Sequence, residues 1–88
     1  MTREEFVEKY FPRGWKPART GSGAVFKNLR GFNVAVMERD EKPGHWKWRI
    51  RPAGSDNVKD DVWSEADSTN EEAAKRAVLG ALARKIGL

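Results

Sequence analysis

One segment, residues 45–51, separates apolar from charged side chains more completely than any other part of the chain. In a β-strand, successive side chains point to opposite faces of the sheet. One face would then hold the apolar side chains of Trp46, Trp48 and Ile50. The other face would hold the basic side chains of His45, Lys47, Arg49 and Arg51. Such a strand needs an apolar layer on one side and water on the other. The sequence therefore predicts a sheet covered on one face and open on the other.

The segments before this strand have the periodicity of one helix and two strands. Thr2 and Glu5 have the spacing of a helix-capping box. Aromatic residues follow at helical spacing as far as Pro12, which is expected to end a short helix. Residues 24–29 and 32–39 read as strands, the second with clear alternation of side chains. Helix, strand, strand and strand are thus predicted in that order.

Glycine, proline and polar residues mark the connections between these elements. The stretch 12–23 is predicted to be a loop, and Arg30-Gly31 a turn. Residues 40–44 are predicted to be a hairpin connection that closes with Pro-Gly, and 54–61 another polar loop.

The last part of the chain has the pattern of an amphipathic helix. Two overlapping capping boxes are predicted to begin it, Ser68 with Glu71 and Thr69 with Glu72. Its buried stripe is predicted to contain Ala74, Ala77, Val78, Ala81, Leu82 and Ile86. The frequent alanine favours a helix that lies close to a sheet.

These elements predict an α+β fold with one domain over residues 1–88. Residues 61–65 are expected to form a short edge strand, with Val62 and Trp63 on opposite sides. A small antiparallel sheet of three or four strands would then be packed on one face by the C-terminal helix, with a short N-terminal helix beside it, in the order α-β-β-β-(β)-α.

Charge is distributed unevenly along the 88 residues, which carry a net charge of +4. Residues 12–51 have ten basic and three acidic side chains, whereas residues 52–72 have one basic and seven acidic. A polarised surface of this kind can steer a partner of opposite charge. The pattern favours nucleic acid or an acidic protein as the partner.

The sequence offers little for catalysis. It has no cysteine and a single histidine, His45, without a sequence-adjacent carboxylate to orient it. The acidic residues after position 55 lack the spacing and the terminal glutamate of a calcium loop. We therefore expect a protein that is not an enzyme and that has no metal, no cofactor and no small-molecule substrate.

The basic row on the central strand is the leading candidate site. Lys47, Arg49 and Arg51 would span roughly 13 Å, a geometry suited to a phosphodiester backbone. Further candidates for the same partner are Lys27, Arg13, Lys16 and Trp15. Trp15 has two interpretations, a ring that stacks on a base or a lid over the small core. In a competing orientation, the indoles of Trp46 and Trp48 would face the ligand.

The acidic segment 56–72 provides an alternative site. In this hypothesis the protein is an interaction or inhibitor module that docks on another protein through Asp56, Asp60, Asp61 and Glu65.

Nothing in the sequence indicates a membrane segment. No apolar run approaches the ~20 residues that span a bilayer. The first five residues are acidic where a signal peptide would be basic and then apolar. We expect a cytoplasmic protein.

Two resemblances are visible. The order of elements resembles the double-stranded-RNA-binding domain, with the alanine-rich stretch 72–77 in the place of its second helix. In that family a lysine cluster opens this helix and contacts phosphates, whereas Glu71 and Glu72 stand at those positions here. The small size, lack of cysteine and polarised charge also look like phage and prophage accessory proteins such as anti-CRISPR inhibitors, which act by occupying a partner surface.

Overall fold

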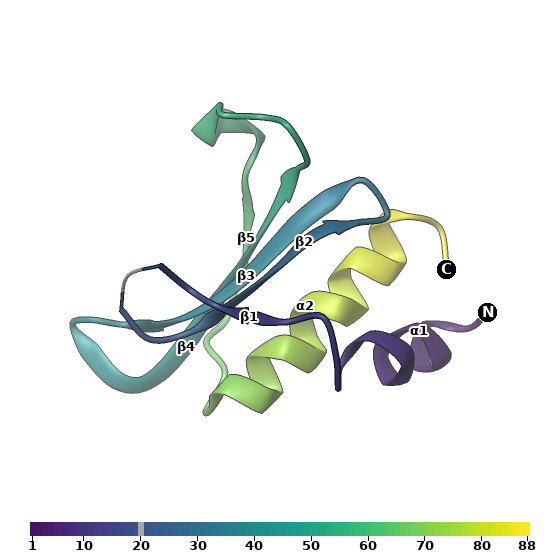
Figure 1. The fold of residues 1–88 in the computed structure, drawn as a ribbon. Helices are drawn as coiled ribbons and strands as arrows, with labels where there is room; N and C mark the ends of the chain where they lie inside the picture. The colour runs from purple at the N-terminus through teal and green to yellow at the C-terminus, as the bar shows by residue number, and fades with distance from the viewer. Residues whose placement is uncertain (20) are drawn as a thin grey trace.

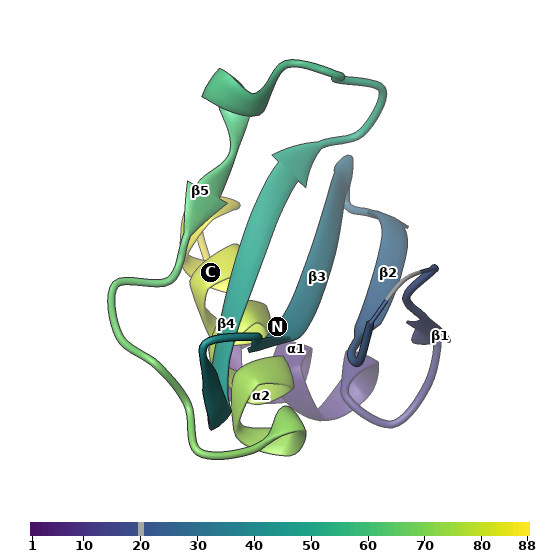
Figure 2. The same cartoon turned by 90° about the vertical axis from the view of Figure 1, so that its left-hand side faces the viewer.

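The computed structural model describes residues 1–19 and 21–88. In these residues, two helices, five strands and one 3-10 helix follow one another along the chain: α1 (Arg3–Tyr10), β1 (Lys16–Pro17), β2 (Ala24–Leu29), β3 (Phe32–Arg39), β4 (Lys42–Pro52), η1 (Val58–Asp60), β5 (Val62–Trp63) and α2 (Glu71–Lys85) (Figure 1). The strands form one antiparallel sheet in the order β1-β2-β3-β4-β5. Both helices lie on the same side of this sheet (Figures 1 and 2). The predicted α+β fold is confirmed.

The core lies between the sheet and α2. In the register of β3 and β4, Val34 is opposite Ile50 and Val36 is opposite Trp48. The three aliphatic side chains are at most 2% exposed, because α2 packs over them. Trp46 and Trp48 are half-buried against the same core, so the predicted inward orientation of the two indoles is confirmed. We call this side of the sheet the covered face.

Two predicted connections differ from the structure. The hairpin turn contains only Asp40 and Glu41, and β4 begins at Lys42 rather than after Gly44. A shift in register after Glu38 accommodates the additional residues as an irregularity at the end of the hairpin. In the stretch 12–23, which was predicted to be a loop, the two residues of β1 pair with β2. Backbone pairing at a sheet edge uses few residues and leaves no pattern in the side chains.

The N-terminal helix is fixed by its cap and by one aromatic anchor. The predicted capping box is confirmed, because Thr2 Oγ1 accepts from the amide of Glu5 and a Glu5 oxygen accepts from the amide of Thr2. Phe6 is completely buried. α1 lies beside α2 (Figure 1), and an ion pair of 2.6 Å between Arg76 and Glu8 also joins the two helices.

The C-terminal helix begins later than the sequence suggested. Asn70 is its N-cap and accepts from the amide of Ala73 at 2.8 Å, so both predicted capping boxes are wrong. The physical reason is that Ser68 exchanges two backbone hydrogen bonds with Trp46, at 2.8 and 2.9 Å, and is held in the sheet. Thr69 is then only the link between the sheet and the helix.

The buried stripe of α2 agrees with the prediction at Ala74, Val78 and Leu82 and differs at the other positions. The side chains that it buries are Ala74, Val78, Leu79, Leu82 and Ala83. Ala77 is exposed, and Ala81 and Ile86 are only half-buried. α2 packs against α1 as well as against β3 and β4, which requires a wider buried surface than a sheet alone. No helix in the described residues has the length and apolar character needed to cross a bilayer.

Candidate binding surface on the open face

The open face is the side of the sheet opposite α1 and α2. Strand register places one side chain from each strand in a row across this face: Lys16, Val25, Ala35, Arg49 and Trp63. Four strand spacings of about 4.8 Å make this row roughly 19 Å long. Lys27 and Lys47 flank it, since each lies two residues from a member of the row on β2 or β4. The row crosses the strands, whereas the predicted row of cations followed β4 alone.

Arg51 is on the open face but does not present a free charge. Its Nε donates to Asp61 Oδ1 at 2.5 Å and its Nη2 donates to Asp61 Oδ2 at 2.8 Å. The Asp61 side chain is only 3% exposed. The hydrogen bonds from Arg51 lower the pKa of Asp61, and those to Asp61 raise the pKa of Arg51. Such a bidentate pair is a geometrically specific link, so it ties the segment after η1 to β4.

Arg49 and Lys47 have a different environment, formed by Trp63. The Lys47 Nζ lies 4.8 Å from the centroid of the Trp63 ring, and the Arg49 Cζ lies 5.9 Å from it. These are cation–π distances. Arg49 Nε is buried and has no hydrogen-bond partner in the described residues. Burial, and then the neighbouring charge of Arg51, lower the pKa of the Arg49 guanidinium.

Trp63 is a surface residue that the sequence did not identify as part of the site. It is 42% exposed and is paired with Arg49 across β4 and β5. Its neighbour Val62 pairs with Ile50, so the two residues lie on opposite sides, as predicted. The signal in the sequence was their alternation, but only strand pairing shows which of them shares a face with the cations.

A hollow of about 300 Å³ lies at the other end of the row. Its walls are formed by β1, β2 and the residues after β1, with Lys16, Pro17, Arg19, Val25 and Lys27 around it. The hollow thus combines an apolar floor with three cationic side chains. Lys16 and Lys27, which the sequence placed in the candidate site, are brought together here with Arg19, which it did not single out.

Two other predicted site residues lie elsewhere. The indole Nε1 of Trp15 donates to the carbonyl of Tyr10 at 3.1 Å, and its ring packs edge-on against Phe26 at 5.7 Å. It is half-buried against the core, which is the lid arrangement of the two that the sequence allowed. Arg13 is exposed in the turn that follows α1.

The acidic segment is largely engaged with basic or polar groups of the protein itself. Besides the Asp61 pair, Asp67 contacts Arg39 at 2.8 Å and His45 at 3.4 Å. The hydroxyl of Ser55 donates to Asp60 at 2.6 Å. The remaining two acidic candidates are both exposed, Asp56 before η1 and Glu65 after β5.

His45 has no sequence-adjacent carboxylate, as the sequence indicated, but Asp67 lies 3.4 Å from its Nδ1. The two residues are distant in sequence, and the bridge between their neighbours Trp46 and Ser68 brings them close. Hydrogen bonding to Arg39 is the main cause that lowers the pKa of Asp67. Because Arg39 shares this carboxylate, the arrangement serves to fasten the β3–β4 hairpin to the connection before α2.

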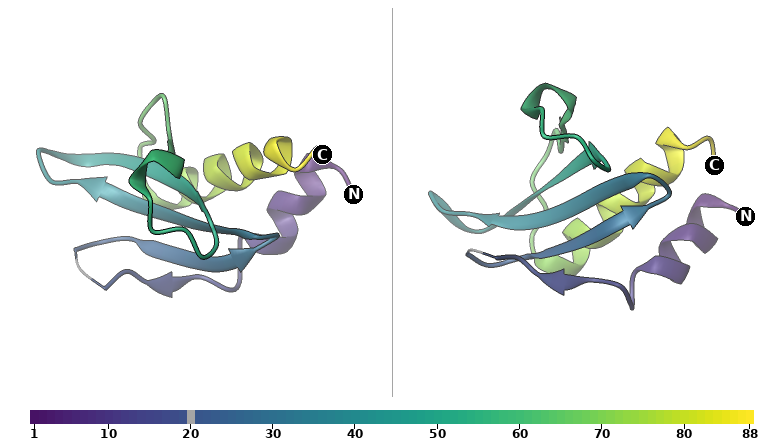
Figure 3. Two further views of the ribbon diagram at one scale, coloured as in Figure 1. Left: turned by 90° about the horizontal axis from the view of Figure 1, so that it is seen from above. Right: turned by 45° about the horizontal axis from the view of Figure 1, so that its top comes forward.

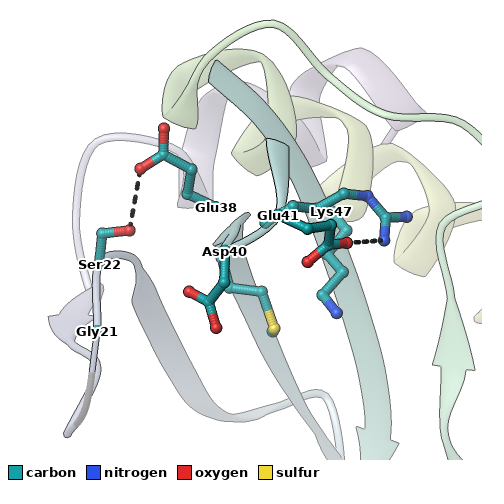
Figure 4. Close-up of a pocket in the computed structure, with 8 residues that line it drawn as sticks. Gly21, Ser22, Glu38, Asp40, Glu41 and Lys47 are labelled. Atoms are coloured by element: carbon teal, nitrogen blue, oxygen red, sulfur yellow. Dashed lines mark hydrogen bonds and ion pairs between the residues drawn. The ribbon is translucent and has the colours of Figure 1, made fainter. Parts of the chain in front are cut away.

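A second hollow, of about 350 Å³, lies at the β3–β4 hairpin (Figure 4). Both signs of charge line it, and several of its side chains are paired with neighbours. Glu38 accepts from the Ser22 hydroxyl at 3.4 Å and from the Gly44 amide at 2.7 Å, and Arg39 contacts Glu41 at 3.5 Å. Over residues 1–19 and 21–88, no three histidine, cysteine, aspartate or glutamate side chains are grouped to hold a metal ion.

The chain matches no protein-family model, no curated protein and no solved structure. Its surface chemistry therefore carries the functional argument. The open face can offer several cations and one exposed aromatic ring to a ligand.

Proposed function

We propose that the protein is a non-catalytic module that binds the sugar–phosphate backbone of nucleic acid through the open face of its sheet. The observation that carries this proposal is the set of cations on that face that form no ion pair with the described residues: Lys16, Lys27, Lys47 and Arg49. Basic side chains that cross a flat surface can neutralise successive phosphates, and the release of counterions then favours binding.

The cost of the arrangement at Arg49 supports the same conclusion. Lys47, Arg49 and Arg51 are like charges on neighbouring positions of one face, and a guanidinium with a buried, unpartnered Nε is unfavourable in the free protein. Groups with perturbed pKa values are frequent at functional sites. A phosphate oxygen would supply both a counter-charge and a hydrogen-bond acceptor.

The alternative, a protein-docking module that uses the acidic segment 56–72, has less support. Asp61 and Asp67 are committed to Arg51 and Arg39 within the protein. The negative charge left for a partner is therefore smaller than the sequence indicated, while the open face retains its positive charge.

The test is the salt dependence of binding to short single-stranded and duplex DNA and RNA, measured by fluorescence anisotropy. Backbone binding gives a linear fall of log affinity with log salt, with a slope of about 0.7 (single strand) to 0.9 (duplex) per phosphate contact. Arg49→Glu should weaken binding and reduce the slope by at least one such contact. Lys9→Glu, at an exposed position of α1, changes the net charge equally and should leave the slope unchanged.

Two results would overturn the proposal. One is the absence of binding to all four nucleic acids at low salt. The other is an equal loss of affinity in the two variants, which would show a response to net charge and not to the open face.

A further inference from the structure

The exposed ring of Trp63 adds a second kind of contact to the open face. Of the large apolar side chains exposed in the described residues, it is the one aromatic. The segment that contains η1 and β5 rises above the rest of the sheet on the side away from α2 (Figures 1 and 3). Trp63, on β5, lies directly beside Lys47 and Arg49 on the open face, and it also borders a hollow of about 530 Å³ that residues of α2 line from the other side.

The row across the sheet connects this ring to the cationic hollow on β1 and β2. Between the two ends, the row contains Val25 and Ala35, whose side chains are short and apolar; Ala35 is only 4% exposed. The longer side chains of Lys27 and Lys47 lie to either side. The surface thus has an aromatic end, a cationic end and a low apolar middle, arranged over roughly 19 Å.

We infer that the ligand of this face is a single-stranded polynucleotide, which crosses the strands of the sheet and stacks one base on Trp63. Its phosphates contact Lys47 and Arg49 at that end and the hollow around Lys16 and Lys27 at the other. This inference rests on the proposed function and specifies its substrate class. DNA and RNA share the phosphates and the flat bases on which it depends.

A duplex fits these observations less well. Its bases are already stacked on one another, so an indole on a sheet surface has no base face to contact. Arg51, which would extend the contact along β4 in the manner suited to a duplex backbone, is held by Asp61. Stacking on an aromatic ring combined with a basic surface is the usual chemistry of proteins that bind single strands without sequence preference.

The experiment uses the full chain and labelled oligothymidylate or oligouridylate of about 12 nucleotides, within the ~4–16 nucleotides that a small β-domain contacts. A duplex and an abasic strand of the same length serve as additional probes. Trp63→Ala should weaken binding to both single strands by about 5- to 150-fold, the loss of one stacked base. The salt slope should be unchanged because no phosphate contact is removed. Trp63→Phe, which keeps a ring, should recover most of the affinity.

The matched control is Val62→Ala, at the neighbouring position with the same 42% exposure but on the opposite side of β5. Val62→Ala should leave every affinity unchanged. Circular dichroism serves to check that each variant is folded. On the abasic strand, Trp63→Ala and the unaltered protein should bind equally.

The outcomes separate the two proposals. If Arg49→Glu weakens binding but Trp63→Ala does not, or if the duplex binds more tightly than the single strands, the stacking inference is overturned and the proposed function stands. If the unaltered protein binds no nucleic acid at low salt, both are overturned.

Discussion

The two faces of β4 show how this small sheet divides its tasks. Ile50 is 2% exposed and packs with Val34, Val36 and α2. Its neighbour Arg49 points the other way, to the face opposite α1 and α2, where its Nε lacks a partner in the described residues and an indole ring is nearby. The covered face thus completes its contacts within the protein, and the open face leaves charge and aromatic surface uncompensated. If the open face binds as proposed, substitutions only one residue apart should alter stability and binding separately.

A second contrast lies within the open face itself. Arg49 and Arg51 are two residues apart on one strand and point to the same side. Asp61 neutralises Arg51 through two hydrogen bonds, whereas Arg49 has no ion pair with the described residues. Of the two arginines, Arg51 has a structural role, and Arg49 is the one that we propose contacts the ligand.

The largest expected effect comes from the covered face. Ile50→Ala should lower the free energy of unfolding by about 2–5 kcal/mol, because it removes a buried aliphatic side chain and leaves a cavity. Arg49→Ala should change it by less than about 1 kcal/mol. Urea denaturation followed by circular dichroism compares the two. Equal losses of stability would contradict the division between the faces.

A smaller effect is expected at the start of the helix that forms the cover. Asn70→Ala should cost about 1 kcal/mol, because it leaves the amide of Ala73 without its acceptor. Thr69→Ala is the control, since Thr69 occupies the predicted cap of the sequence but not the observed one. If Thr69→Ala is the more damaging substitution in thermal melts, the assigned N-cap is wrong.

The smallest effect concerns the pair that distinguishes the two arginines. The pKa of Asp61 lies below its ordinary value of 3.8 in the folded protein. The pair therefore stabilises the fold above about pH 4, and this contribution is lost as the pH falls through the lowered pKa. Asp61→Asn should make the protein less stable at neutral pH and its stability less dependent on pH below 4, as measured by thermal melts over a pH series. A pH profile identical to that of the unaltered protein would contradict this role.

The same variant also sharpens the functional comparison. Asp61→Asn removes the counter-charge of Arg51, so it should increase the salt slope for the duplex by about 0.9, one additional phosphate contact along β4. In the alternative hypothesis of an acidic docking segment, the variant would instead remove a contact with the partner. Anisotropy titrations of the variant and the unaltered protein at several salt concentrations measure the change.

Local patterns in the sequence were sufficient for much of the fold. Alternation along β4 gave the correct faces for Trp48 and Arg49, because the side-chain period of a strand needs no tertiary information. The first helix was also predicted with its cap. The start of α2 was not, since pairing of Ser68 with Trp46 depends on a contact between distant segments.

The candidate site was only partly predictable for the same reason. The sequence identified the cations but not their pairing, which requires Asp61 to return to Arg51 after η1. The sequence did not show which face of the sheet Trp63 occupies. β5 has only two residues, and their faces are known only from their pairing with β4. The row of side chains crosses the strands because of the register between them, and this register cannot be derived from the sequence of one strand alone.

The most direct measurement of the central claim is an NMR titration of the full chain with a single-stranded oligonucleotide. We expect the indole Nε1–H signal of Trp63 and the methyl signals of Val25 and Ala35 to shift on binding. The methyl signals of Val34 and Val36, on the covered face, should stay in place. Shifts confined to the covered face and α2, with Trp63 unchanged, would contradict binding through the open face.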